Sequence, residues 1–267
     1  MLNRARSLLG HRMSNRLARR KIGACCAFVC FAGLGLRSLP AGAEGATANP
    51  PAATSVTPCT EALVQKVQAR YDGIRDLRAR FVQTTWAVSL GIASGVEDPA
   101  AERSSGRVVF AKPGRMRWAY ETPEETFVVS DGQILWIYDA ETREAQRLPV
   151  GSGFLSGAAI QFLLGDGDLR EAFSINEVSC SGSRPRLGLV PREPSSYERL
   201  EIAVEATTGF VVETRIFDLF GNETRVELDA IEINQNPEAD LFRFRPPPGS
   251  RVIELPETTP SPFGEDR

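Results

Sequence analysis

Large apolar side chains recur at every second position between Gly106 and Tyr138. This period of two is typical of β-strands, in which alternate side chains point to the same face of a sheet. Turn signals at residues 112–114, 121–123 and 130–132 interrupt the alternation, and in the last of them Asp-Gly supplies the positive backbone angles of a tight hairpin. The segment is therefore predicted to form four short strands. We expect one face of this sheet to carry Val108, Phe110, Met116, Trp118, Tyr120, Phe127, Val129, Ile134, Trp136 and Tyr138.

The rest of the chain also favours a mainly β fold. Leu77 to Trp86 alternates as a strand, and Phe81 is expected on its inner face. Many short antiparallel strands at regular spacing indicate a strongly curved sheet or a barrel. Because turn residues separate further short alternating runs, strands are also predicted at 143–148, 173–179, 186–190, 197–205, 210–217, 224–233 and 241–244.

Two helices are predicted beside this sheet. The first begins after Thr57 as N-cap, has Pro58 in its first turn and carries an apolar stripe to about Gly73. The second covers residues 153–165 and is apolar on nearly every side, which suits either a lid over an apolar site or an ordinary core helix. Residues 87–105 form a longer, partly apolar insertion that could extend a strand, act as a flap or remain a mobile loop.

The first 43 residues are predicted to be a secretory signal peptide. Seven basic residues and no acidic residue lie within the first 21, the apolar run from Ile22 to Leu36 follows, and Ala-Gly-Ala suits cleavage after Ala43. A twin-arginine signal at Arg19-Arg20 stays open beside ordinary secretion. We expect residues 44–57 to be a flexible linker, 58–256 one folded domain and 257–267 a disordered tail.

Removal of the signal changes the charge balance. The mature chain keeps 23 basic residues against 34 acidic ones, a formal charge of −11. Such a chain is a poor candidate for binding nucleic acid or adsorbing to anionic lipid.

Cleavage also leaves two cysteines of five, Cys59 and Cys180. In an oxidising compartment we predict a disulfide between them, although two buried free thiols would be the alternative. In the chain-entropy view, a bond that spans this separation stabilises the fold by about 4 to 5 kcal/mol.

Catalytic chemistry has little support in the sequence. The only histidine, His11, lies inside the signal peptide, so Ser-His and Cys-His catalysis and a zinc or copper site are not expected in the mature chain. Glu124, Glu125 and Asp131 are carboxylates that could in principle act as an acid pair, but Asp131 has a sufficient role in its turn. We therefore expect a binding protein with no catalytic residue, metal or cofactor.

Several runs of the chain resemble one protein family. These are KPGRMRWAY at 112–120 and FVVSDGQILWIYD at 127–139, with LRARFVQ at 77–83, FDLFGNETRVELDAIEIN at 217–234 and FRFRPPPG at 242–249. The chain from about Cys59 to Leu255 is thereby similar to the outer-membrane lipoprotein carrier proteins, the LolA family. This resemblance implies an incomplete, half-open antiparallel β-barrel covered by a helical lid.

The same resemblance implies a function. A member would be a monomer in the periplasm, would accept acylated lipoproteins from an inner-membrane ABC exporter of the LolCDE type, and would pass them to an outer-membrane acceptor. Two alternatives keep the fold: a shuttle for free lipids or glycolipids, and a regulatory domain that senses mislocalised lipoproteins.

The acyl chains would lie against the large residues of the sheet and the lid, unless these rings are plain core. In the family a basic residue before the proline of the first motif ties barrel to lid by hydrogen bonds. Here that residue is Lys112, and Arg115 or Arg117 could have taken over its role. The expected lipid-binding residues are Phe81, Phe110, Met116, Trp118, Tyr120, Phe127, Val129, Trp136, Tyr138, Leu155, Ile160 and Phe162.

Overall fold

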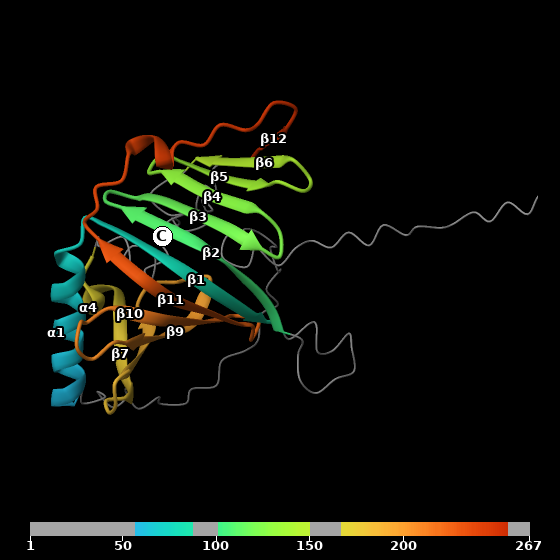
Figure 1. Ribbon diagram of the computed structural model, residues 1–267. Coiled ribbons are helices and arrows are strands. Elements are labelled where there is room, and N and C mark those ends of the chain that lie inside the picture. Colours follow the sequence, from blue (N-terminus) through green and yellow to red (C-terminus); the bar gives the residue numbers. More distant parts are fainter. Residues whose placement is uncertain (1–56, 88–100, 150–166, 256–267) are drawn as a thin grey trace, which may run out of the picture.

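A computed structural model describes residues 57–87, 101–149 and 167–255 of the chain (Figure 1). The predicted signal peptide, most of the linker and the tail lie outside these residues, and so does the apolar helix expected at 153–165. The helices are α1 (Pro58–Asp72), α4 (Leu169–Ala172) and the 3₁₀ turn η2 (Ala239–Phe242). The strands are β1 (Asp76–Trp86), β2 (Ala101–Ala111), β3 (Arg115–Thr122), β4 (Thr126–Asp131), β5 (Ile134–Asp139), β6 (Glu144–Pro149), β7 (Phe173–Ser179), β8 (Arg186–Pro191), β9 (Tyr197–Val204), β10 (Val211–Asp218), β11 (Glu223–Ile233) and β12 (Arg251–Glu254).

All twelve strands belong to one sheet, in the order β12-β6-β5-β4-β3-β2-β1-β11-β10-β9-β8-β7. The strands β12 and β7 stand at its two ends, so the sheet is open and curves without closing (Figure 1). Every pair is antiparallel except β12 with β6, which is parallel. The mainly β, incompletely closed fold is thus confirmed, with one parallel strand that the sequence pattern did not indicate.

Strand prediction was wrong at residues 241–244. The chain after β11 instead forms η2 and returns to the sheet only at β12. Asn234 and Asn236 adopt positive φ angles of 57° and 54°, which turn the backbone out of the β11 direction. The buried Asp76 carboxylate accepts hydrogen bonds from the backbone N–H groups of Gln235 and Asn236 at 2.7 and 3.0 Å, and these bonds hold the turn.

The end of the predicted insertion at 87–105 extends a strand, one of the alternatives left open by the sequence. Residues 101–105 belong to β2 and pair with β1, from Ala101 opposite Trp86 to Ser105 opposite Val82. The two strands therefore form a long hairpin (Figure 1).

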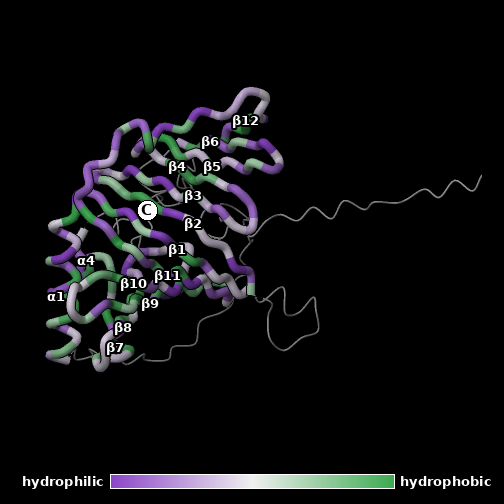
Figure 2. Tube along the Cα trace, viewed as in Figure 1, coloured by the Kyte–Doolittle hydropathy of each residue, from purple (hydrophilic) through white to green (hydrophobic). Residues whose placement is uncertain are grey.

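Helix α1 has the cap that its sequence predicts. The Thr57 side chain accepts a hydrogen bond from the Thr60 N–H at 3.3 Å, and Pro58 occupies the first turn. The buried side of α1 joins the hydrophobic core of the sheet through Leu63, Val67 and Tyr71. Because apolar and polar residues alternate along the strands (Figure 2), the sheet can bury one face against this helix.

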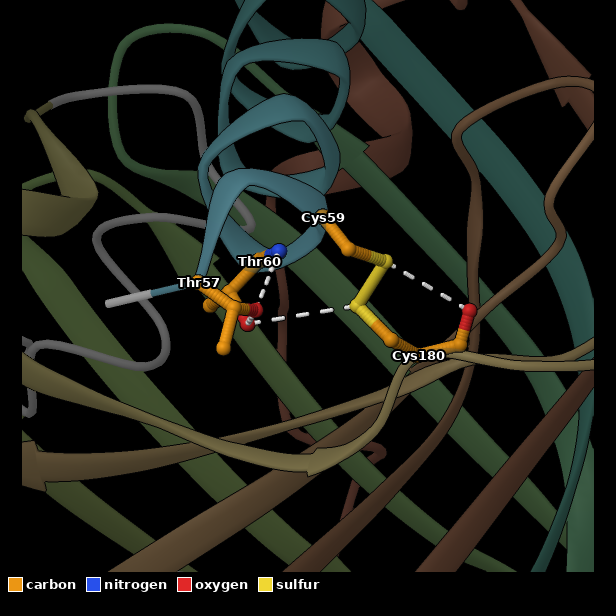
Figure 3. The surroundings of a disulfide bond; sticks show 4 residues. All are labelled: Thr57, Cys59, Thr60 and Cys180. Atoms are coloured by element: carbon orange, nitrogen blue, oxygen red, sulfur yellow. Dashed lines mark hydrogen bonds between the residues drawn. A yellow bond between two sulfur atoms is a disulfide. The ribbon is translucent and has the colours of Figure 1, made fainter. Parts of the chain in front are cut away.

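A disulfide ties α1 to the far edge of the sheet, as predicted. The Cα atoms of Cys59 and Cys180 lie 6.2 Å apart, and the bond links the first turn of α1 to the end of β7 (Figure 3). At the other end of α1, Lys112 Nζ donates a hydrogen bond to the Tyr71 carbonyl oxygen at 3.3 Å. The Arg70 Nε donates to the Thr208 carbonyl at 2.7 Å, so the helix is fastened along its length.

Candidate functional site

The inner face of the sheet is defined here as the face that carries Phe81, Phe110 and Trp118. Strand register brings these residues together: Phe110 lies opposite Met116, Val108 opposite Trp118 and Gly106 opposite Tyr120. On the other side of β2, Phe81 lies opposite Gly106. Directly opposed residues of an antiparallel pair share a face, so three neighbouring strands contribute to one apolar surface.

Four rings on this surface form the inner aromatic cluster: Phe81, Phe110, Trp118 and Tyr120. Phe81 is at its centre, with ring centroids 4.7 Å from Trp118 and 4.9 Å from Tyr120, both edge to face. Phe110 meets Trp118 at 5.8 Å. Phe81, Phe110 and Tyr120 are buried, whereas Trp118 is only half-buried. The cluster is therefore a packed floor with one ring partly open to a ligand.

Gly106 makes this packing possible. A Cβ atom at this position would stand 1.9 Å from the Ala119 carbonyl oxygen, far inside van der Waals contact. The absence of a side chain lets β2 and β3 approach where the register shifts between Ser105 and Gly106. Phe81 and Tyr120 meet over this glycine from the two neighbouring strands.

A second group of predicted residues lies on the opposite, outer face, so the prediction of a single shared face was wrong. Tyr120 pairs with Thr126, which places Val128 beside Trp118 on the inner face and Phe127 on the outer face. Val128 in turn pairs with Ile137. The length of the turn between Tyr120 and Thr126 sets which residues of β3 and β4 lie opposite each other. A shift of this register by one residue moves every side chain of a strand to the other face of the sheet. The residues affected are Phe127, Val129, Ile134, Trp136 and Tyr138.

The C-terminal strap, residues 236–254, covers this outer surface. Phe244 of the strap contacts Tyr138 and Trp136, at ring centroid distances of 5.3 and 5.8 Å. Phe242 of η2 is buried, and the Arg115 guanidinium lies 5.2 Å from its ring centroid. We refer to Phe127, Trp136, Tyr138, Phe242 and Phe244 as the outer aromatic cluster. The sequence pattern indicated Phe242 and Phe244 only as alternating residues of the strand predicted at 241–244.

Known proteins are similar in sequence to most of this chain. Residues 72–245 match the family described as outer membrane lipoprotein carrier protein LolA. The outer-membrane lipoprotein carrier protein of Chromobacterium violaceum is 30% identical over 212 residues, which cover 78% of this chain and 95% of that protein. The carrier protein of Methylibium petroleiphilum is 32% identical over 177 residues, 66% of this chain and 81% of that one. The chain belongs to the LolA family.

A solved structure of a LolA superfamily protein from Nitrosomonas europaea is also similar. It has a TM-score of 0.37 and 12% identity, and the match covers 67% of this chain and 97% of that one.

Lys112, the expected latch residue, is hydrogen-bonded to helix α1. Its hydrogen bond ends on the last turn of α1, where a cation also complements the negative end of the helix dipole. Arg115 and Arg117 point to the outer face instead. The Arg117 Nη1 donates to the Leu241 carbonyl at 3.4 Å, and its guanidinium lies 4.9 Å from the Phe127 ring centroid. Burial lowers the pKa of Arg117. The two arginines thus hold the strap.

The remaining expected site residues, Leu155, Ile160 and Phe162, lie outside the described residues. Within the described ranges, no three histidine, cysteine or acidic side chains are grouped so that they could hold a metal ion. Among the helices of the same ranges, none is long and apolar enough to cross a membrane.

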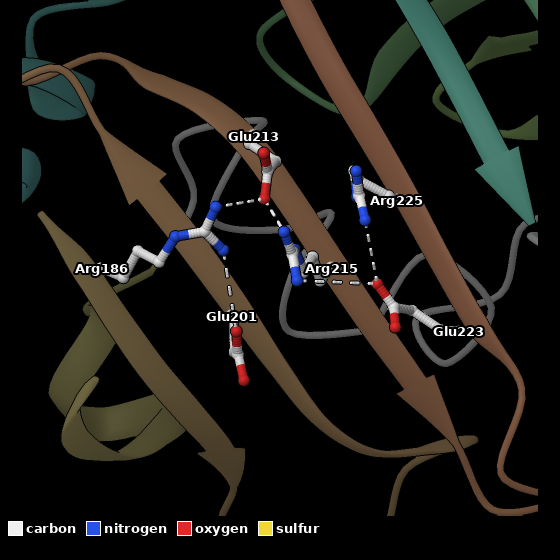
Figure 4. Close-up of polar contacts among 6 residues, drawn as sticks. All are labelled: Arg186, Glu201, Glu213, Arg215, Glu223 and Arg225. Carbon is white, nitrogen blue, oxygen red and sulfur yellow. Dashed lines mark hydrogen bonds and ion pairs between the residues drawn. The ribbon is translucent and has the colours of Figure 1, made fainter. Parts of the chain in front are cut away.

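A charged ladder crosses the outer face of β8–β11. Glu213 lies at its centre, 2.9 Å from Arg186 and 2.7 Å from Arg215 (Figure 4). Glu201, Glu223 and Arg225 extend the ladder to both sides. Burial by itself would raise the pKa of Glu213, but the hydrogen bond from Arg215 and the charges of Arg186, Arg215 and Arg225 outweigh it and lower the pKa. This half of the outer face is polar and internally neutralised.

Proposed function

We propose that this LolA-family protein is a periplasmic carrier that binds the acyl chains of lipoproteins released from the inner membrane and delivers them to the outer membrane. The observation that carries the proposal is the inner aromatic cluster: apolar rings on one face of an open sheet, with Trp118 half-buried. The names of the relatives, outer-membrane lipoprotein carrier proteins, support the same reading.

The energetics of acyl binding suit such a surface. Each buried methylene contributes about 0.8 kcal/mol, so one long chain buried completely contributes on the order of 10 kcal/mol. Full burial of several chains would make release very slow. A carrier is better served by a surface that covers its ligand in part, and an open sheet whose inner face carries the half-buried Trp118 has this character.

The strand register reduces the set of residues that we propose to contact the ligand. Phe127, Val129, Trp136 and Tyr138 leave the set because they lie on the outer face. Lys112 stays a proposed latch through its bond to α1. Leu155, Ile160 and Phe162 stay proposed as lid residues. The retained floor of the site consists of Phe81, Phe110, Met116, Trp118 and Tyr120.

The cellular setting is part of the proposal. Signal cleavage after Ala43 would deliver residues 44–267 to the periplasm, with 44–57 as linker, 58–256 as the carrier domain and 257–267 as a tail. The protein would act as a monomer without catalysis. It would receive cargo from an inner-membrane ABC exporter of the LolCDE type and release it to an outer-membrane acceptor.

Native mass spectrometry of the mature protein from periplasm tests the proposal. We expect an adduct with the mass of an acylated polypeptide. Adducts of free-lipid mass alone would replace the carrier by a lipid shuttle. A bare protein that also fails to release lipoproteins from spheroplasts would contradict transport and favour a sensor.

Two tryptophans provide a matched pair for this experiment. Trp118→Ala removes the half-buried ring of the inner face, and Trp136→Ala removes a ring of similar burial from the outer face. The carrier function predicts loss of the acylated adduct in the first variant and its retention in the second. Equal retention in both would place the ligand elsewhere on the molecule.

A further inference from the structure

The inner face changes character along the strands. Near α1 it is apolar, with Leu77, Phe110 and Met116 in one row across β1, β2 and β3. Polar side chains occupy the next two rows of β1 beyond Phe81. Gln83 is opposite Ser104 of β2, and Thr85 is opposite Thr224 of β11. The rings of Phe81 and Tyr120 lie between these two ends.

These polar residues are deeply buried. The exposed fractions are 2% for Gln83, 7% for Thr85 and 8% for Thr224. An amide or hydroxyl group buried in an apolar core costs stability unless it forms hydrogen bonds, and valine or methionine would fill the same space without that cost. We refer to these three residues with the Tyr120 hydroxyl as the polar end of the inner face.

The hydrogen bonds within the polar end orient the Gln83 amide. The Tyr120 hydroxyl donates to Gln83 Oε1 at 3.1 Å, which leaves the Nε2 group on the side of Thr85. Nε2 meets the Thr85 hydroxyl only at 3.5 Å, the outer limit of a hydrogen bond. A primary amide has two N–H donors. Within the described part of the chain, this long contact is the one hydrogen bond that Nε2 donates.

We propose that the polar end is a subsite for the ester carbonyl groups of a diacylated ligand. This inference rests on the proposed function and adds to it an orientation of the bound ligand. Gln83 Nε2 and the hydroxyls of Thr85 and Thr224 donate to the carbonyl oxygens, which have no hydrogen to donate in return. The hydrocarbon chains then extend over Phe81 and Trp118 toward Phe110 and Met116, at the end fastened to α1.

Orientation is the functional gain of such a subsite. Hydrocarbon alone binds an apolar surface without direction. Polar contacts at one end fix which part of the ligand leaves the sheet first, and a small number of polar groups in an otherwise apolar site commonly provides this specificity.

A ligand pair that differs only at the carbonyl groups tests the proposal. One probe is a synthetic peptide whose N-terminal cysteine carries a dipalmitoylglyceryl group, and the other is the same peptide with ether-linked hexadecyl chains. We expect the mature wild-type protein to bind the ester probe about tenfold more tightly than the ether probe. Gln83→Met is expected to remove most of this preference, measured as the ratio of the affinities for the ester and ether probes.

Controls separate a subsite from a structural role. Thr85→Val should reduce the ester preference, whereas Thr84→Val, on the same strand but on the outer face, should retain it. If Gln83→Met fails to fold in a thermal unfolding assay, Thr224→Val provides the same test without the Tyr120 contact. A preference that survives in the folded Gln83→Met and Thr224→Val variants overturns the proposal.

Three further outcomes have distinct meanings. Equal wild-type affinity for the ester and ether peptides overturns the subsite and leaves the carrier function intact. Binding of neither peptide overturns the carrier function and the subsite with it. A second probe pair, dipalmitoyl and dihexadecyl phosphatidylglycerol, identifies the source of the ester ligand. An ester preference seen only with the peptides assigns the subsite to lipoproteins. An ester preference seen with the phospholipids as well supports recognition of the glycerol ester itself.

Discussion

The two aromatic clusters of this protein are built from the same residue types on neighbouring parts of one sheet, β1–β3 for the inner cluster and β4–β5 with the strap for the outer cluster, yet they have different surroundings. The inner cluster lies on the face that packs with α1 and keeps Trp118 partly accessible. The outer cluster is contacted by the strap, because Phe244 packs on Trp136 and Tyr138, and Arg115 and Arg117 lie over Phe242 and Phe127, while Phe127 and Trp136 stay half-buried. Aromatic content alone therefore does not identify a binding surface; what covers the rings does.

The two segments that pack on the faces of the sheet, α1 and the C-terminal strap, are also attached in different ways. The disulfide at Cys59 and the hydrogen bonds of Arg70 and Lys112 hold α1 at both of its ends. The strap is held by exposed or half-exposed side chains, such as Arg147 with Glu254 at 2.9 Å and Arg143 with the Pro248 carbonyl at 2.6 Å, and by the four-residue strand β12. Solvent-exposed ion pairs contribute little each, so the buried Phe242 is the main anchor of the strap.

The largest expected effect comes from removing one central ring of each cluster. Phe81→Ala and Phe242→Ala should each lower the free energy of unfolding by about 3 to 5 kcal/mol, because both rings are almost fully buried. Urea denaturation measures this loss. The two variants should then differ in their affinity for the dipalmitoyl peptide: Phe81→Ala should bind it more weakly than the wild type, and Phe242→Ala should bind it as the wild type does. The reverse order would make the outer face the binding surface.

A somewhat smaller effect is expected from Gly106→Ala. The added Cβ would collide with the backbone of Ala119, and the strands would have to separate under the inner cluster, at a loss of about 3 kcal/mol. Gly73→Ala is the matched control, because a Cβ there meets its nearest atom at an ordinary 3.7 Å. Thermal unfolding compares them. Similar melting temperatures for Gly106→Ala and the wild type would refute the close-approach role of Gly106.

Arg117→Met should have a moderate effect confined to the outer cluster. It removes the hydrogen bond to Leu241 and the contact with Phe127 but keeps the apolar stem, so a loss of about 1 to 2 kcal/mol is expected. With Trp86 and Trp118 replaced by Phe, the emission of Trp136 should shift to longer wavelength as the strap loosens. Arg107→Met, an exposed arginine of β2, is the control that should change neither quantity.

The smallest effect concerns the charged ladder and depends on pH. Since the folded-state pKa of Glu213 is lowered, its contribution to stability is present above the ordinary value of 4.5 and is lost as the pH falls through the folded-state pKa. Glu213→Gln should therefore cost about 1 kcal/mol at pH 7 and progressively less below pH 4.5. Glu227→Gln, at the exposed position opposite Glu213 on β11, should change stability little. A Glu213→Gln deficit that stays constant down to pH 3 would contradict the assignment.

Local sequence determined most of the elements. Period-two alternation located ten of the strands, β1 and β3 to β11, to within a few residues. Thr57 and Pro58 marked the start of α1, and the pairing of Cys59 with Cys180 followed from their being the two cysteines outside the predicted signal peptide. These features depend on neighbours in the chain or on simple counting, so no tertiary information was needed.

Tertiary structure alone decided which face each ring occupies. Alternation states that Trp118 and Tyr120 share a face, and that Trp136 and Tyr138 share a face, but it cannot relate the two pairs. Their relation depends on the pairing of Tyr120 with Thr126 and of Val128 with Ile137, which turn geometry sets. The folding of the strap over one face, and the meeting of Gln83 with Tyr120 on the other, likewise join residues far apart in sequence, and only the packed sheet brings them within contact distance.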